Sequence, residues 1–253
     1  MMKRLLTSLL ALAAMAGSAN AQVVMVGRSD SRNLIGFNLG QLWLNGSDPC
    51  FPGDTTDCGR VDDDTLVANL RATDPLRFEL GDFDEFTFGA EWLYGVTDYL
   101  ETGVGFGFYK RTVPSVYRDV VHTNGAEIAQ DLRLRTFPIT GSVRFLPLGR
   151  GGAFEPYIGG GVTFINWSYK ESGEFVDSAT GDVFLAQYEA DGTAVGPVIL
   201  GGVRIPVGDA FTIGGEYRWQ KADGDTNQLE SELLGSRIDL GGQSLSFTMH
   251  FRF

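Results

Sequence analysis

The sequence predicts an all-β fold, an eight-stranded antiparallel up-and-down transmembrane β-barrel. Three observations support this: apolar and polar residues alternate with a period of two, the connections between alternating segments are short and long in turn, and the last residue is aromatic. The clearest segment is the final one, SLSFTMHFRF, whose apolar positions are Leu245, Phe247, Met249, Phe251 and Phe253. Such alternation indicates a strand with one apolar and one polar face.

Eight segments carry this alternation, and each is long enough for a tilted membrane-spanning strand, which needs about 9–11 residues. They are Leu34–Leu44, Glu85–Tyr94, Tyr99–Arg111, Leu132–Phe145, Phe154–Ser168, Ala194–Val207, Ala210–Lys221 and Ser244–Phe253. In hydrocarbon every backbone N–H and C=O needs a partner within the protein, and only a closed sheet gives every strand two neighbours. We therefore predict that the eight strands close into a barrel.

The connections between these segments alternate in length. Residues 95–98, 146–153 and 208–209 form short connections, whereas residues 45–84, 112–131, 169–193 and 222–237 are long and rich in Gly, Asp, Glu and Ser. Membrane barrels of this kind have tight turns on the periplasmic side and long loops outside. We expect three turns and four long extracellular loops within a barrel domain of residues 22–253.

Residues 1–21 predict a secretory signal peptide that is cleaved from the mature chain. Lys3 and Arg4 precede an apolar run, Leu5–Ala16, and Ala19–Ala21 is a small-residue cleavage pattern. The alternative is an N-terminal membrane anchor, but the run is shorter than the ~20 residues of a spanning helix. The chain is also acidic, with a net charge of −12, which argues against nucleic acid as a partner because that would need a basic face.

The first long loop carries two features of its own. Cys50 and Cys58 are the two cysteines of the chain, and in an exported protein such a pair indicates a disulfide. A metal site is the alternative, but two thiolates without a nearby histidine do not complete a zinc shell. The loop is also acidic, which fits either a solvated surface or a weak divalent-cation site; its aspartates are Asp48, Asp54, Asp57, Asp62, Asp63, Asp64 and Asp74.

Alternation alone leaves open which face points outward. In a soluble, lipocalin-like barrel the apolar face would point inward. Glycines on the polar face suit a narrow lumen: Gly103, Gly105, Gly107, Gly159 and Gly161. Aromatic residues also gather at both ends of the segments, as interfacial girdles do: Trp43, Phe108 and Trp219 at one level, and Trp92, Tyr94, Phe145 and Phe253 at the other. Both features favour lipid on the outside.

With this orientation the polar phase points into the lumen and carries four acidic and four basic residues. They are Glu91, Glu101, Glu155, Glu216, Arg144, Arg204, Arg218 and Arg252. Buried charges need partners, so we predict a network of Glu–Arg pairs that plugs the barrel near its short turns. Eight strands leave an interior that side chains fill, which argues against an open pore. A gated or proton-linked conduit is the alternative.

Arg133 and Arg135 break the pattern because they share the parity of Phe137 and Ile139. One explanation is that a bulge near Pro138 reverses the phase. The other is that both arginines point outward above the hydrocarbon. There they would contact the phosphates of lipopolysaccharide, whose oxygens suit the guanidinium fork. Trp167 breaks the phase in the same way and indicates a bulge or a position above the membrane.

The histidines do not indicate catalysis. His250 lies on the inward phase with Ser246 and Thr248, so we expect it to fill the lumen. A lipid-modifying serine–histidine pair would have to lie on the outward face, where lipid reaches it. No role is assigned to His122, and the sequence predicts no cofactor.

Several stretches resemble repeated blocks of small eight-stranded outer-membrane barrels of the OmpX/OmpW/opacity-protein type. They are EWLYGVTDYLETGVGFGFY (91–109), FPITGSVRFLPL (137–148), PYIGGGVTF (156–164), GGEYRW (214–219) and the terminal strand, whose Phe253 looks like the assembly signal of such barrels. The resemblance implies the outer membrane of a Gram-negative bacterium, with the periplasmic chaperones and the assembly machinery as partners. It implies no shared activity, since members serve as adhesins, complement-evasion factors, conduits, lipid A enzymes or scaffolds.

The functional hypothesis is therefore a monomeric, non-enzymatic outer-membrane protein whose loops engage external ligands or neighbouring lipopolysaccharide. One alternative is a conduit for small or hydrophobic molecules. Another is a lipid-modifying enzyme, for which the outward face offers no serine–histidine pair.

Overall fold

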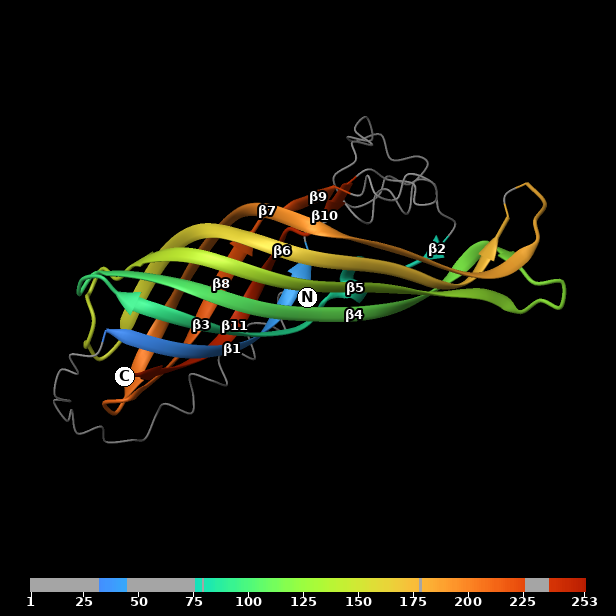
Figure 1. The fold of residues 1–253 in the computed structure, drawn as a ribbon. Coiled ribbons are helices and arrows are strands. Elements are labelled where there is room, and N and C mark those ends of the chain that lie inside the picture. Colours follow the sequence, from blue (N-terminus) through green and yellow to red (C-terminus); the bar gives the residue numbers. More distant parts are fainter. Residues whose placement is uncertain (1–31, 45–75, 79, 178, 226–236) are drawn as a thin grey trace, which may run out of the picture.

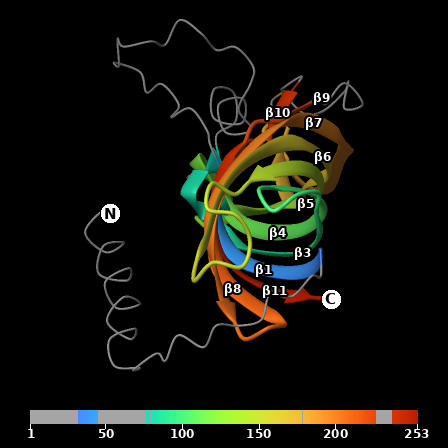
Figure 2. The same cartoon turned by 90° about the vertical axis from the view of Figure 1, so that its left-hand side faces the viewer.

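Eight long strands pair with their neighbours in chain order and close into a ring (Figures 1 and 2). The computed structural model describes residues 32–44, 76–78, 80–177, 179–225 and 237–253. The ring strands are β1 (Asn33–Leu44), β3 (Glu85–Gly95), β4 (Leu100–Val121), β5 (Glu127–Phe145), β6 (Glu155–Val176), β7 (Val183–Val207), β8 (Phe211–Gln220) and β11 (Gly242–Arg252). All neighbours are antiparallel, and β11 pairs with β1 to close the barrel. The predicted fold class is confirmed.

Four short elements lie outside the ring. β2 (Leu76–Arg77) pairs with β4, and β9 (Asp223–Asp225) pairs with β10 (Arg237–Asp239) and, at one position, with β7. The 3₁₀-helix η1 (Leu80–Phe83) contacts β1 and β4. Among the described residues, no helix is both long and apolar enough to cross a membrane.

The apolar faces of the ring strands point outward. Phe247 and Phe251 are 55 % and 43 % exposed, whereas Glu91 and Arg144 are 6 % and 0 % exposed. Because successive side chains of a strand point to opposite faces, these values fix the orientation of the neighbouring residues as well. The arrangement is that of a membrane barrel and is the reverse of a soluble lipocalin-like barrel, so the latter alternative is wrong.

Two of the predicted loops are largely strand. Of residues 112–131, only 122–126 connect β4 to β5, and of residues 169–193, only 177–182 connect β6 to β7. These connections turn at Gly125 and Gly181, whose φ values of +82° and +75° suit glycine. The expectation of four long loops is therefore corrected at these two places. The β4–β5 and β6–β7 hairpins instead form a sheet that projects past the other strands (Figure 1); we call this end of the barrel the hairpin end.

The sequence pattern does not predict these strand extensions, because apolar and polar residues exchange faces within them. In the membrane belt apolar residues point outward, but in the projecting sheet the buried, inward residues are apolar, as Val113, Leu132 and Trp167 are. Arg133 and Arg135 occupy the outward positions there. A sheet in water must turn its apolar face inward. The register of β4 with β5 is kept as far as Val116, although the pattern of hydrophobicity reverses before that point, and it shifts only between Val116 and Val121.

An apolar cluster fills the barrel at the hairpin end. Leu76, Phe78 and Phe83, from the segment around β2 and η1, pack against inward residues of the long strands. Those residues include Tyr109, Val113, Tyr117, Ile128, Leu132, Leu134, Ile165, Trp167, Tyr169, Ala190 and Ala194. The phenolic hydroxyl of Tyr109 donates a hydrogen bond to the carbonyl oxygen of Phe83. This cluster holds the segment that precedes β3 against the inner wall.

Candidate functional site

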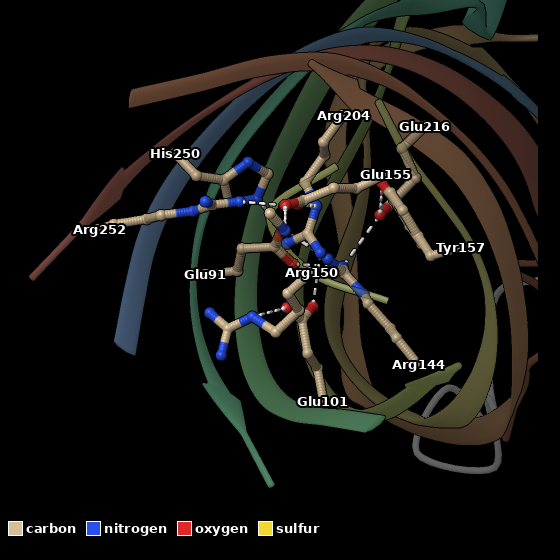
Figure 3. A network of polar contacts seen from close by, with 11 residues as sticks. Glu91, Glu101, Arg144, Arg150, Glu155, Tyr157, Arg204, Glu216, His250 and Arg252 are labelled. Atoms are coloured by element: carbon tan, nitrogen blue, oxygen red, sulfur yellow. Dashed lines mark hydrogen bonds and ion pairs between the residues drawn. The ribbon is translucent and has the colours of Figure 1, made fainter. Parts of the chain in front are cut away.

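The lumen near the short turns contains a buried ion network centred on Arg144 (Figure 3). Its Nη2 lies 2.5 Å from Oε2 of Glu91 and 2.9 Å from Oε2 of Glu216. The second oxygen of Glu91 lies 2.7 Å from Nε2 of His250, and the hydroxyl of Tyr157 donates to Glu216 over 3.0 Å. One guanidinium from β5 thus neutralises carboxylates from β3 and β8.

A second group of pairs is centred on Arg204 of β7. Its Nη2 lies 2.8 Å from Glu101, and its Nε lies 3.6 Å from Glu155. Glu155 also contacts Nη2 of Arg252 at 2.5 Å, and Glu101 contacts Nε of Arg150 at 3.3 Å. Arg204, Glu101 and Glu155 are fully buried. Removing such charges from water is costly, and the close pairing offsets that cost.

Tyr157 joins the two groups. Its ring centroid lies 5.0 Å from the guanidinium carbon of Arg144 and 5.2 Å from that of Arg204, distances at which an aromatic face attracts a cation. Arg218 extends the network toward the middle of the barrel through Glu216, at 3.2 Å. The network therefore spans the lumen, as Figure 3 shows.

All eight charged residues that the sequence places in the lumen belong to this network. Three further residues contact them that the sequence does not indicate as partners: Tyr157, His250 and Arg150. Tyr157 and His250 share the inward parity of their strands, so parity indicates their position but not their contacts. Arg150 lies in a short connection, where parity does not apply. Gly149 and Gly151, at φ +71° and +82°, turn this connection, and the Arg150 side chain reaches Glu101 at the end of the lumen.

The outward face of β4–β7 changes from apolar to charged over a short distance. One row of residues paired across these strands is apolar: Phe106, Ile139, Phe164 and Val195. Nearer the hairpin end lie two further rows, which we call the charged rows: Lys110, Arg135, Ser168 and Asp191, then Thr112, Arg133, Lys170 and Glu189. The pairing of β5 with β6 is continuous past Pro138, so the bulge explanation is wrong and Arg133 and Arg135 point outward.

A groove of 590 Å³ lies over these rows. Its polar lining includes Arg135, Ser168 and Asp191, and its apolar lining includes Phe108 and Phe137. The phenylalanines mark the edge of the apolar belt that faces lipid. The groove therefore lies at the boundary between the apolar belt and the charged rows.

His122 has a partner that the sequence did not indicate. Its Nε2 lies 3.1 Å from Oε2 of Glu174, which links the tip of the β4–β5 hairpin to β6. This hydrogen bond lowers the pKa of the Glu174 carboxyl. The contact therefore helps to hold the two hairpins side by side.

Some predicted features lie outside the described residues: the signal peptide (1–21), the Cys50–Cys58 disulfide and the aspartates of residues 48–74. The terminal Phe253 is described. Its side chain is exposed on the outward face, and its N–H donates to the carbonyl oxygen of Asn33 over 3.1 Å.

The match to a protein-family model supports the architecture. The family model of the outer membrane protein beta-barrel domain matches residues 7–253, whereas no curated protein matches the sequence significantly. Similar solved structures include OprG of Pseudomonas aeruginosa (13 % identity, TM-score 0.49, covering 88 % of this chain and 96 % of that one). Another is the N-terminal barrel of Pseudomonas aeruginosa OprF (12 % identity, TM-score 0.42, covering 88 % of this chain and 98 % of that one). A third is Neisserial surface protein A (13 % identity, TM-score 0.44, covering 87 % of this chain and 96 % of that one). The family match covers nearly the whole chain, and the chain belongs to the outer-membrane protein β-barrel family of Gram-negative bacteria.

Proposed function

We propose that this protein is a sealed, non-catalytic binding protein of the outer membrane. Its projecting sheet lies outside the cell, offers a strand edge to external polypeptides, and contacts lipopolysaccharide through the charged rows. His250 supports a non-catalytic role because it is buried beside Glu91 in the lumen, away from lipid. The ion network supports a sealed lumen because it spans the barrel from β3 to β8.

The observation that carries the proposal is the open edge of β7. Within the described part of the chain, residues 183–194 pair with β6 on one side and with no strand on the other. β8 pairs with β7 only from Val198 onward, and β9 pairs with it only at Val195. Unpaired backbone groups along such an edge are a template for an added strand, a common way of binding extended peptides.

Side chains along this edge favour one class of peptide. On the outward face it presents Glu189 and Asp191, and on the other face it presents Phe184 and Tyr188. A strand that alternates basic and apolar residues complements both rows. A second copy of the edge does not, because antiparallel pairing about Ala190 sets Glu189 opposite Asp191, and like charges directly opposite are destabilising.

We expect the full-length protein in lipid nanodiscs to bind a labelled peptide that alternates Val and Lys and matches residues 183–194 in length. A Val–Glu peptide is the control ligand. Glu189→Lys/Asp191→Lys should weaken Val–Lys binding roughly tenfold, because two cross-strand charge pairs become repulsive. Fluorescence anisotropy measures the affinity, and isotope-edited infrared spectroscopy detects intermolecular strand pairing.

Asp209→Lys is the matched control because Asp209 is exposed in the β7–β8 turn at the opposite end of the barrel. It should leave the affinity unchanged. Equal affinity for both peptides, or self-association of the wild-type protein through this edge, would contradict the proposal.

The charged rows support contact with lipopolysaccharide phosphate. Lys110 is directly opposite Arg135, and Arg133 is directly opposite Lys170. Such like-charge pairs disfavour the sheet on their own, and an anion between them removes the repulsion. Phosphate suits this position because guanidinium groups bind its oxygens in pairs. We therefore assign Arg133 and Arg135, with Lys110 and Lys170, to the phosphate zone of the outer leaflet.

A further inference from the structure

Three charged side chains of one row have no partner in the described part of the chain. Lys110, Arg135 and Asp191 make no hydrogen bond or ion pair there, although each is flanked by charged or polar neighbours. Glu189 differs, since it accepts a hydrogen bond from Ser168 over 3.2 Å and lies 4.0 Å from Lys170. The groove therefore has a free cation, Arg135, on β5 and a free carboxylate, Asp191, on β7. Lys110 of β4 does not line the groove but lies directly opposite Arg135 in the sheet.

The spacing keeps these charges apart. Arg135 pairs with Ser168, and Ser168 pairs with Asp191, so the two charged residues are two strands apart, or about 10 Å between backbones. The small Ser168 side chain between them leaves the groove open. Below it, Phe108 and Phe137 continue into the apolar belt. A ligand that fits this groove therefore has an anionic group and a cationic group joined by a short linker. Its apolar part would lie against the phenylalanines.

We propose that this groove binds a zwitterionic headgroup made of a phosphate and a primary amine, as in phosphoethanolamine. The phosphate lies between Lys110 and Arg135, and the ammonium group donates hydrogen bonds to Asp191. The inference rests on the proposed phosphate contact and adds the amine to it.

Two simpler ligands fit less well. A phosphate without an amine leaves the Asp191 carboxylate unpaired beside a second anion, which repels it. A divalent cation alone needs about six or more oxygen ligands. The groove is lined by two carboxylates, Asp191 and Glu189, and Glu189 already contacts Ser168 and Lys170. A primary amine pairs with the Asp191 carboxylate and needs fewer oxygen ligands than a metal ion, because it supplies a positive charge at the β7 side of the groove.

The test uses the full-length protein in phosphatidylcholine nanodiscs that contain phosphatidylethanolamine, phosphatidylglycerol or phosphoethanolamine-modified lipid A. Native mass spectrometry measures which lipid the protein retains. The quaternary ammonium of phosphatidylcholine donates no hydrogen bond, and phosphatidylglycerol has no amine. We expect the wild-type protein to retain the two amine-bearing lipids about tenfold over phosphatidylglycerol, the effect of one charge-assisted hydrogen bond.

The variants separate the two halves of the headgroup. Asp191→Asn should abolish the tenfold preference, because retention of the amine-bearing lipids falls and retention of phosphatidylglycerol does not fall with it. Arg135→Gln should lower retention of all three lipids. Asp209→Asn is the matched control, and heat-modifiable gel mobility shows that each variant is folded. Retention of one amine-bearing lipid and not the other identifies the source of the headgroup and supports the site.

Two results would overturn the inference in different ways. If Arg135→Gln lowers retention but Asp191→Asn keeps the preference for amine-bearing lipids, the amine contact is wrong and the phosphate contact stands. If neither variant changes retention, the phosphate contact is wrong as well. Asp191 also belongs to the peptide-binding edge of β7, but peptide binding is measured separately with its own variant, so neither lipid outcome decides it.

Discussion

Arg144→Met is expected to lower the free energy of unfolding by about 3–5 kcal/mol. Arg144 is fully buried and is the guanidinium that contacts both Glu91 and Glu216. Methionine keeps an unbranched side chain but removes the positive charge, and it leaves two carboxylates in a lumen with little access to water. Urea titration of the protein in lipid vesicles, followed by heat-modifiable gel mobility, measures the loss.

Two further variants separate lost charge pairing from lost packing. Arg133→Met removes an exposed guanidinium from the same strand and should change the stability by no more than about 0.5 kcal/mol. Adding Glu91→Gln and Glu216→Gln to Arg144→Met should restore much of the stability, because neutral amides cost less to bury than carboxylates that have lost their shared guanidinium. An Arg144→Met protein as stable as Arg133→Met would show that the network does not stabilise the barrel.

Phe83→Ala is expected to cost about 3–5 kcal/mol, the usual range for a large aromatic residue removed from a packed interior. Phe83 is fully buried, and its ring lies 6.1 Å from that of Phe78 in an edge-to-face arrangement. The substitution leaves a cavity in the apolar cluster and loosens the segment that packs inside the hairpin end. The same urea titration measures the decrease in the free energy of unfolding.

Phe86→Ala is the matched control, since Phe86 lies three residues further along and is 64 % exposed on the outward face. Phe86→Ala should lower the free energy of unfolding clearly less than Phe83→Ala does, because no interior cavity forms. Equal losses for the two variants would contradict the packing of residues 76–83 against the inner wall.

The barrel and its ion network could be predicted from the sequence because successive side chains of a strand always point to opposite faces. Once Phe247 and Phe251 are set outward, Glu91, Arg144 and Arg204 must point inward, whatever the loops do. Closure of an eight-stranded ring then brings them close together. The same reasoning places Tyr157 and His250 in the lumen, but it does not say which carboxylate each one contacts.

The projecting sheet was not accessible in the same way. Val113, Leu132 and Trp167 point inward, which is the arrangement expected of a sheet surrounded by water and not by lipid. The reversal of hydrophobicity therefore looked like the end of the strand. Arg150 was missed for another reason: its position depends on turn conformation at Gly149 and Gly151, which alternation does not encode.

The measurement that tests the account most directly is the conductance of the purified protein in planar lipid bilayers. If the ion network of Arg144, Arg204 and their carboxylates closes the lumen, the wild-type protein inserts without producing current steps. That result also separates a sealed binding protein from the conduit alternative. Reproducible, stable single-channel steps that require the protein and appear at neutral pH would contradict the account.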